Sequence, residues 1–529
     1  MGSDTRRRDA DDTVSIVEKR HRRRRSHTAA TQRATGVYPG ARPSGLLPRA
    51  AKVGRMSSVD SAVLESAKVA IRPIADRFAL TEALEQHRSH RWRHSLPRLP
   101  VLSHDDVSAI PFLVGITGIE EYQHRARLRA GDGDLFAAGT PQTDGYEDYC
   151  RTHLGLGSAE FIHAEPEEGP LAVASACSHG ASLERIVATA RAGNGLIIHP
   201  YMGIETVWTL ANRVAQQSGQ PTTVLAPPPP VTWIANDKAA FGEVVSRVLG
   251  ADWLVETYET HEPSDLAKHL VDLASRHARV ALKRLRCASA MGNAVFEASE
   301  LKQLAPADVQ SIVDSFLSRT EWQGDEEVQA VAWEETDLSP STQLWIPPDG
   351  MGPPRLDGTY EQILEGEHGV FLGSRPSTLP EPINQALGEA SLRVAAALQA
   401  LGYVGRCSFD FLVVGDPDSD FELHFTECNG RWGGTSTPMS LLDRLIDGPR
   451  PPYRAQDFVR AGLVGASFGD VLAAVGDELY DPTSRRGRLV LYNVGPLAET
   501  GKIDVIALGR TQEEAEEMME VRLPALLGV

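Results

Sequence analysis

The chain has 529 residues, of which 42% are hydrophobic and 23% are charged, the composition of an ordinary globular protein. This length allows about two to four domains and a sizeable hydrophobic core. No run approaches the roughly 18 consecutive apolar residues that a membrane span needs, so we expect no membrane partner.

The net charge of −18 is unevenly distributed along the sequence. Residues 1–55 carry a net charge of +9, so the remaining residues carry −27. Binding of nucleic-acid phosphates requires a positive surface, which an acidic body does not offer. We therefore expect no nucleic-acid partner, although local basic pockets remain compatible with this charge.

Residues 1–58 are predicted to form a disordered basic tail, because the run Lys19–Arg25 repels itself and few apolar residues accompany it. Two other interpretations stay open, a true translation start near Met56 and a targeting segment. The targeting interpretation lacks the apolar region of roughly 7–15 residues that follows the charges in secretory signals.

The cysteines favour a reducing compartment. They are odd in number and show neither a CxxC pair nor zinc-type spacing. Free thiols in the cytosol are the default for such a set, so we expect a cytoplasmic protein. The five cysteines are Cys150, Cys177, Cys287, Cys407 and Cys428.

Residues 59–230 are predicted to form an α/β domain. Pro111–Thr117 and Gly195–His199 are short apolar runs typical of buried strands. Leu183–Ala192 and Ile204–Gln217 have the apolar spacing of helices.

The end of this domain is marked by prolines. In Pro221–Pro230 a short strand pattern is followed by four consecutive prolines. Consecutive prolines continue neither a helix nor a central strand, so they predict a stiff connector. We place a domain boundary after residue 230.

Residues 231–448 alternate between helical and strand patterns, and a small last domain is expected over 449–529 after the proline-rich Pro449–Pro452. Helices are predicted over Asp237–Leu249, Ala307–Leu317, Ala386–Leu401 and, in the last domain, Gln512–Leu523. Strands are predicted over Val280–Leu285, Val328–Glu335 and, in the last domain, Arg488–Val494.

A hairpin is predicted from Gly405 to Cys428, because two alternating segments flank the turn formers Asp416–Asp420. A turn centred on Asp418 and Ser419 pairs Gly415 with Glu422, Val414 with Leu423, Leu412 with Phe425, and Asp410 with Glu427. It places Leu412, Val414, Leu423 and Phe425 on the face of the two acids.

Two like charges that face each other on a buried sheet destabilise it unless a cation lies between them. Beginning with Glu427 of this pair, the residues Glu427, Asn429 and Arg431 occupy alternate positions, which project to one side of an extended strand. Such a segment offers oxygen ligands for a hard cation and a guanidinium for phosphate or carboxylate. The alternatives are a slipped register, or pairing of both acids with basic side chains.

Two lysines precede the hairpin. Lys238 follows Asn236 and Asp237 at the start of a helix, where anions are favoured. Lys283 lies within an apolar strand, where a buried lysine needs a partner. The small-residue loop Ser289–Asn293 comes six residues later and is suited to close over phosphates. Taken singly, each lysine is more often structural than functional.

The order of these residues resembles the ATP-grasp carboxylate–amine ligases over roughly residues 231–448. The resemblance implies an α/β ATP-grasp fold, with a lid over about 231–335 and a metal-binding core over about 336–448. Residues 59–230 would then form the α/β domain that precedes the ATP-grasp domain in this family, and residues 449–529 a small C-terminal α+β domain.

The same resemblance implies roles for single residues. ATP would be held by Lys238, Lys283, Ser289, Gly292 and, at the adenine, Glu334, with Glu335 as its rival. Two Mg²⁺ ions would be held by Asp410, Glu427 and Asn429, with Arg431 as the catalytic contact to the acyl intermediate. Arg375 is a candidate clamp for a substrate carboxylate, and a solvated arginine in a surface turn is the equal alternative.

More narrowly, the chain resembles the peptide ligases of the pheganomycin type. The segments that carry this likeness are Trp233–Lys238, Leu338–Ile346, Gly405–Phe411, Glu427–Gly434 and Gly501–Arg510. The resemblance implies ATP-dependent joining of an amino-acid or peptide-like carboxylate to an amine through an acyl phosphate. Many relatives are dimers, so a homodimer is among the expectations. An ATP-grasp kinase and a non-catalytic Mg-ATP-binding module are the alternatives.

Overall fold

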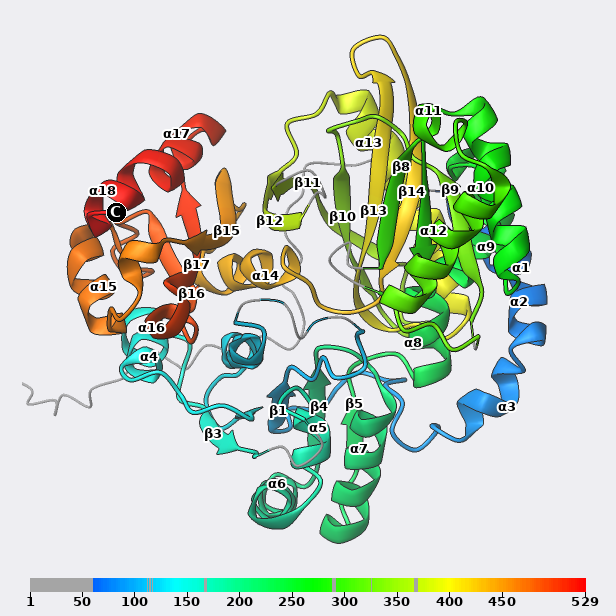
Figure 1. Cartoon of the computed structure of the whole chain (residues 1–529). Coiled ribbons are helices and arrows are strands. Elements are labelled where there is room, and N and C mark those ends of the chain that lie inside the picture. The colour runs from blue at the N-terminus through cyan, green and yellow to red at the C-terminus, as the bar shows by residue number, and fades with distance from the viewer. Residues whose placement is uncertain are drawn as a thin grey trace, which may run out of the picture. The chain divides into compact units, whose positions relative to one another are not determined.

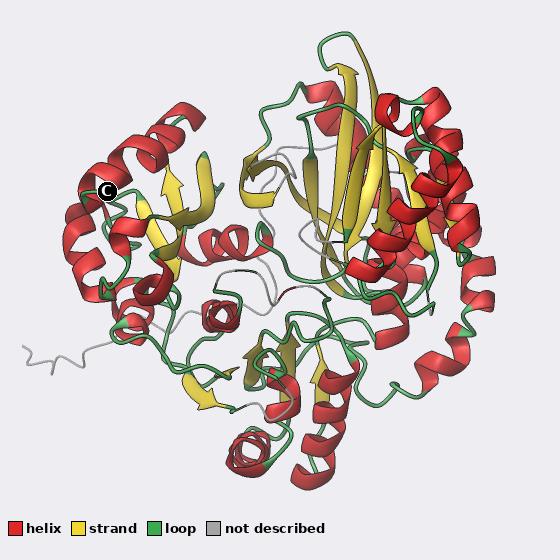
Figure 2. Ribbon diagram, in the orientation of Figure 1, coloured by secondary structure: helices red, strands yellow, loops and turns green. Residues whose placement is uncertain are grey.

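The computed structural model describes residues 60–111, 113, 116, 118–165, 169–287, 292–324, 326–365 and 370–529. The predicted basic tail and the predicted loop residue Ser289 lie outside these residues. The described residues combine helices with one parallel and two antiparallel sheets (Figures 1 and 2). The predicted mixed α/β class is therefore confirmed.

Three short helices begin the described chain: α1 (Ser61–Ala70), α2 (Arg72–Arg77) and α3 (Leu80–Glu85). Ala67 and Ile74 of these helices share an apolar cluster with α9 (Lys238–Leu249) and α13 (Glu381–Ala400). The first helices thus pack against elements that come much later in the sequence.

The parallel sheet has the strand order β3-β2-β1-β4-β5. Its strands are β1 (Val101–His104), β2 (Leu135–Ala138), β3 (Glu160–His163), β4 (Leu196–Pro200) and β5 (Thr222–Val224). The associated helices and turns are η2 (Glu120–Arg129), α4 (Tyr146–Asp148), η3 (Tyr149–His153), α5 (Val173–Ala176), α6 (Gly180–Ala192) and α7 (Glu205–Ser218). The strand predicted near Gly195 and the two predicted helices are confirmed as β4, α6 and α7.

The strand predicted over Pro111–Thr117 is wrong for the residues that the structure describes there. Pro111, Leu113 and Ile116 lie in turns, bends and 3-10 geometry. Leu113 is buried in an apolar cluster, and Ile116 packs against it. An apolar run indicates burial but not a strand, and here Leu113 is buried outside a strand.

The last two of the four prolines do not act as a connector. Helix α8 (Pro229–Asn236) begins with them. The first helical turn has no intrahelical use for the N–H that proline lacks, so it tolerates proline. Asp237 then caps α9, accepting from the N–H groups of Ala239 and Ala240 at 3.1 Å.

An antiparallel sheet with the order β6-β9-β7-β8 follows. Its strands are β6 (Thr257–Thr260), β7 (Arg279–Arg284), β8 (Asn293–Glu297) and β9 (Val328–Ala332). The helices of this part are η4 (Ala251–Trp253), α10 (Pro263–Arg276), α11 (Ala298–Leu301) and α12 (Pro306–Arg319). Leu270 of α10 and Val313 of α12 are fully buried in one cluster with Leu282 of β7, so these helices cover the sheet.

The third sheet joins distant parts of the chain in the order β14-β13-β10-β11-β12-β15-β17-β16. Its strands are β10 (Pro340–Ile346), β11 (Arg355–Glu365), β12 (Val370–Pro376), β13 (Gly405–Asp416), β14 (Asp420–Asn429), β15 (Tyr453–Val459), β16 (Leu489–Asn493) and β17 (Lys502–Leu508). The helices around its C-terminal strands are α14 (Ser436–Leu445), η5 (Ala461–Leu463), α15 (Phe468–Val475), η6 (Gly476–Glu478), α16 (Leu497–Thr500), α17 (Gln512–Glu517), η7 (Met518–Arg522) and α18 (Leu523–Leu527).

The predicted hairpin is present as β13 and β14, but its register differs from the expected one near the turn. Asp410 pairs with Glu427 as expected, whereas Phe411 pairs with Phe425 across a bulge that leaves Thr426 unpaired. Leu412 consequently faces His424 rather than Phe425. The bulge turns Phe425 and its neighbour Leu423 toward the buried side, and both join the apolar cluster there.

Within the described part of the chain, no helix is both long enough and apolar enough to cross a bilayer.

The junction between β12 and β15 yields a stability prediction. It pairs only Gly373 with Gln456 and Ser374 with Ala455. A Cβ on Gly373 would lie 2.2 Å from the Ala455 carbonyl oxygen, so we expect Gly373→Ala to lower the free energy of unfolding by about 1–3 kcal/mol. Urea denaturation followed by tryptophan fluorescence measures this.

The matched control is Gly469→Ala in helix α15. A Cβ there meets nothing closer than 3.7 Å, and alanine suits a helix interior better than glycine. Equal stability of the two variants would contradict the importance of the close approach at Gly373.

Candidate functional site

The candidate site is built around the paired residues Asp410 and Glu427. They lie on neighbouring strands, on the face opposite the buried side chains of Phe409 and Phe411. The two carboxyl groups share one face because the residues are direct cross-strand partners, and the register changes only after them.

Asp410 is held by polar neighbours on two strands. The Asn429 Nδ2 atom donates to Asp410 Oδ2 at 2.9 Å. Ser341 of β10 pairs with Asp410 in register, and its side chain hydrogen-bonds to the carboxyl group. Burial and the neighbouring Glu427 charge raise the pKa of Asp410 to about 7, against these hydrogen bonds and the charge of Arg431.

The pKa of Glu427 is shifted in the opposite direction. Its Oε2 lies 3.2 Å from the Lys238 Nζ atom. Burial opposes ionisation of Glu427, but the charges of Lys238, Arg431 and Lys283 outweigh it and lower the pKa of Glu427. Glu427 therefore ionises at a lower pH than Asp410 does.

Lys238 is aimed at this carboxylate by the packing of its helix. Phe241, one turn along α9, packs against Phe409 and Phe425, with ring centroids 5.4 and 5.9 Å apart. The rings fix α9 against the apolar face of the hairpin, and Lys238 reaches the acid from the helix N-terminus.

The N-terminal end of this helix is also tied to the end of β14. Asn236 accepts from the Gly430 N–H at 3.0 Å and donates to the Gly430 carbonyl at 3.3 Å. A Cβ at position 430 would lie 2.6 Å from the Asn236 amide nitrogen. A side chain at position 430 would therefore displace the Asn236 amide from this contact.

Lys283 extends from β7 toward the same acids. Its ammonium lies 5.2 Å from the centroid of the Trp333 ring, within cation–π range. Burial, with the nearby charge of Lys238, lowers the pKa of Lys283 to about 8, although Glu427 acts to raise it. The structure therefore brings together the two lysines that the sequence singled out.

A cavity of about 1080 Å³ connects these groups with the predicted adenine site. Both lysines and both acids line it. Glu334 and Glu335 line it as well, so the choice between them stays a prediction.

A second cavity, of about 540 Å³, also reaches the acids. Asp410, Glu427, Gln362 and Phe371 line both cavities. The acid pair therefore stands where the two cavities adjoin, with Arg431 and Asn429 on the wall of the second one only.

Arg431 is positioned by the parallel-sheet part of the chain. Its Nη1 donates to the Tyr201 hydroxyl at 3.2 Å and to the Trp432 carbonyl at 3.1 Å. Tyr201 directly follows β4, and the Trp432 N–H donates to its carbonyl at 3.0 Å. The sequence interpretation missed Tyr201. Its place in the sequence could have indicated it, because ligand-binding residues often lie directly after a buried parallel strand.

Gly292 closes the described end of the loop after Lys283. A Cβ at this position would lie 2.5 Å from the Cys287 sulfur. The Lys238 Nζ atom contacts Cys287 as well, with the carbonyl oxygen at 3.5 Å. Gly292 and Lys238 thus both lie beside Cys287, while Ser289 falls outside the described residues.

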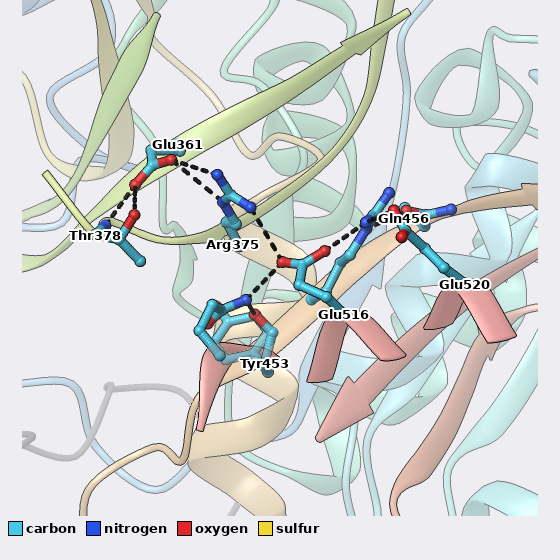
Figure 3. A network of polar contacts seen from close by, with 9 residues as sticks. Glu361, Arg375, Thr378, Tyr453, Gln456, Glu516 and Glu520 are labelled. Atoms are coloured by element: carbon cyan, nitrogen blue, oxygen red, sulfur yellow. Dashed lines mark hydrogen bonds and ion pairs between the residues drawn. The ribbon is translucent and has the colours of Figure 1, made fainter. Parts of the chain in front are cut away.

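Arg375 is already paired with carboxylates (Figure 3). It donates to Glu361 at 2.8 Å and to Glu516 at 3.3 Å. It lines the larger cavity, so it lies close enough to act there, but a substrate carboxylate would have to compete with both partners. The alternative of a solvated arginine in a surface turn is also not found, because Arg375 lies in strand β12, is half-buried and is paired with Glu361.

The oxygen donors suit a hard divalent cation. Among the described residues, no three His, Cys, Asp or Glu side chains gather as a metal site. The local set is two carboxylates and one amide, which are ligand types that Mg²⁺ uses together with water and phosphate oxygens. The facing, partly buried acids form a place that a cation neutralises, so these residues fit the ion.

No protein-family model and no curated protein sequence matches the chain. Solved structures that are similar to it include a carboxyaminoimidazole ribonucleotide synthase from Aspergillus clavatus, solved with ATP. Its TM-score is 0.42 at 14% identity, over 66% of this chain and 85% of that one.

Two other similar structures are biotin carboxylases. That of Campylobacter jejuni has a TM-score of 0.45 at 12% identity, over 75% of this chain and 86% of its own. The biotin carboxylase domain of Hydrogenobacter thermophilus 2-oxoglutarate carboxylase, solved with MgADP and bicarbonate, has a TM-score of 0.47 at 12% identity, over 82% and 94%.

The acid pair yields a binding prediction. Glu427→Gln keeps the shape of the side chain but removes the charge that faces Lys238. Loss of one partner of a buried charge pair costs about 2–5 kcal/mol, so we expect Mg-ADP affinity to fall by more than about 30-fold. Isothermal titration calorimetry with and without Mg²⁺ measures this.

Glu422→Gln is the matched control on the same strand, because the Glu422 side chain is 76% exposed. Its Mg-ADP affinity should stay that of the unchanged protein. Unaltered affinity in both variants would contradict the assignment of Glu427 to the cation.

Proposed function

We propose that the protein is an ATP-dependent carboxylate–amine ligase of the ATP-grasp type. The observation that carries the proposal is the convergence of Lys238 and Lys283 on Asp410 and Glu427, at the place where two cavities adjoin. One cavity then takes the nucleotide and the other takes the groups to be joined.

In this proposal the larger cavity binds ATP. Lys238 and Lys283 neutralise the phosphates, and Gly292 belongs to the loop that covers them. Glu334, or its neighbour Glu335, meets the adenine. The sequence resemblance supports these roles, and the lining of the cavity by the lysines and both glutamates is consistent with them.

Asp410, Glu427 and Asn429 would hold two Mg²⁺ ions, which would neutralise the β- and γ-phosphates when bound. The chain itself must keep the acids ready for this. Lys238 does so by holding Glu427 ionised until the ion arrives, and Asn429 by fixing the orientation of Asp410.

The reaction proposed has two steps. A substrate carboxylate oxygen attacks the γ-phosphorus of ATP, and ADP leaves, which gives an acyl phosphate. An amine then attacks the acyl carbon, loses a proton and expels phosphate, which leaves an amide. Phosphoryl transfer of this kind depends on positioning and charge neutralisation more than on covalent help.

Arg431 is the proposed catalytic residue. It lines the smaller cavity next to the acids, and its planar fork can pair with the acyl phosphate or with the oxyanion that follows. The Tyr201 hydroxyl at 3.2 Å orients this guanidinium.

We further propose the division of the chain that the resemblance implies. Residues 59–230 form the preceding α/β domain, 231–448 the ATP-grasp domain and 449–529 the C-terminal domain. The separate sheets of residues 101–224 and 257–332 support the first boundary.

Within this class, we place the protein with the peptide ligases that join amino-acid or peptide-like substrates, as the narrower resemblance suggests. The five free cysteines suit a reducing compartment, so we propose the cytoplasm. A homodimer remains part of the proposal on family resemblance alone.

The direct test is a screen of amino acids and short peptides as acid and amine, with ADP release and product mass measured together. We expect ADP to form only when both partners are present, together with an amide product. ADP formation without an amine, with a phosphorylated product, would favour a kinase. Binding of Mg-ATP without ADP formation from any pair would favour a non-catalytic module.

A second prediction concerns Arg431→Lys, which keeps a positive charge but removes the planar fork. Loss of one such contact to the transition state costs about 10²–10³ in kcat, with little change in KM for ATP. Steady-state kinetics would show this split. Arg485→Lys, at a side chain that is 68% exposed, should behave as the unchanged enzyme, and equal activity of both variants would contradict the role of Arg431.

A further inference from the structure

A group of polar side chains that the proposed chemistry does not use lies along the smaller cavity, and all of its members except the buried Asp504 line the cavity wall. Asp457 of β15 lies 2.5 Å from the Lys502 ammonium of β17 and accepts from the Tyr122 hydroxyl at 2.9 Å. Arg125 stacks over the Tyr122 ring and pairs with Asp504 at 2.5 Å. We name these five residues the β15–β17 cluster.

The strand order separates this cluster from the reacting end. Asp410 lies on β13, and the order β13-β10-β11-β12-β15 places Asp457 four strands away. Neighbouring strands lie about 4.8 Å apart, so the path across the sheet is about 19 Å.

A single cavity follows this path. Its wall includes Ser341 of β10, Gln362 of β11 and Leu372 of β12, and it reaches Asp457 of β15 and Lys502 of β17. The residues that line it thus step from strand to strand along one face of the sheet.

The middle of the cavity is apolar. Phe371 and Val459 line it from the sheet, and Val107 and Ile119 face it from the parallel-sheet part. Tyr201 and Tyr122 both pack against the cluster that contains Val107 and Ile119. Tyr201 contacts Arg431, and Tyr122 contacts Asp457. One apolar surface therefore connects the reacting end to the β15–β17 cluster.

The most exposed charge of the cluster is a carboxylate. The side chains of Arg125, Lys502 and Asp504 are only 6%, 5% and 0% exposed, whereas Asp457 is 19% exposed. A ligand entering the cavity meets Asp457 first among them, which favours a positively charged group.

We propose that Asp457 binds the free ammonium group of an elongated, peptide-like acid whose opposite end, the carboxylate, is activated beside Asp410. This inference rests on the proposed ligase function and specifies its acid substrate. An extended chain advances about 3.3–3.6 Å per residue, so a path of about 19 Å corresponds to a peptide of five to six residues.

The test uses alanine oligomers of one to seven residues as probes, each with a free and with an acetylated N-terminus. Binding is measured by calorimetry to the full chain in the presence of Mg-ADP. We expect affinity to rise with length to about five or six residues, and acetylation of the best oligomer to weaken binding at least 10-fold. Acetylation that leaves every affinity unchanged would overturn the inference.

The variant Asp457→Asn sharpens the test. It should remove most of the difference between free and acetylated oligomers while leaving the affinity for Mg-ADP unchanged. Asp477→Asn, at an exposed carboxylate of the same C-terminal part, should keep the full difference. Because Asp457→Asn removes a carboxylate that pairs with Lys502, the fold of the variant is checked by thermal unfolding. If the variant is unstable, the acetylation series on the unchanged protein decides the question.

Failure of this inference and failure of the proposed function give different results. If no oligomer binds, or if binding ignores length and the N-terminus, the β15–β17 cluster is structural only. ADP and amide formation from another acid would still support the ligase function. If no acid and amine pair yields ADP, the ligase proposal fails whatever the oligomers do.

Discussion

The interaction on which the site depends is the repulsion between Asp410 and Glu427, and the way the fold controls it. Two carboxylates paired on adjacent strands raise the free energy of the folded state unless their charges are separated or neutralised. The protein separates them by giving each a different partner. Lys238 lowers the pKa of Glu427, while burial beside Glu427 raises that of Asp410 to about 7. The two acids therefore differ in how readily they ionise, and Lys238 pairs with the more acidic one.

This arrangement needs three parts of the chain at once. The bulge at Thr426 lets Phe425 face the apolar cluster while Glu427 stays opposite Asp410. Phe425 then packs on Phe241, which fixes the helix that carries Lys238. The core of the hairpin and the charge at its edge are therefore coupled, so a change in packing behind the sheet is expected to move the lysine in front of it.

Local patterns predicted much of this structure, because the relevant contacts are short in sequence. Alternation placed Asp410 opposite Glu427, and helical spacing placed Lys238 at a helix start; both are found in the structure. The bulge could not be predicted, since the preference of Leu423 and Phe425 for the apolar cluster outweighs regular pairing only once that cluster exists. Tyr201 was missed for a related reason, because its contact with Arg431 joins residues 230 positions apart.

The two ends of the smaller cavity also differ in how far apart in the sequence their residues lie. At the reacting end, Glu427, Asn429 and Arg431 come from one strand and its extension, so a short motif can report them. At the far end, Tyr122 and Asp457 meet through a contact that spans 335 positions, and no short pattern contains both. Chemistry common to a class of enzymes can reside in a local motif, whereas a surface that measures the length and charge of a substrate must be assembled from separate elements. In the proposed function, substrate choice is therefore expected to depend on the contacts of β15 and β17 with Tyr122 and Arg125, and to change without any change in the acid pair.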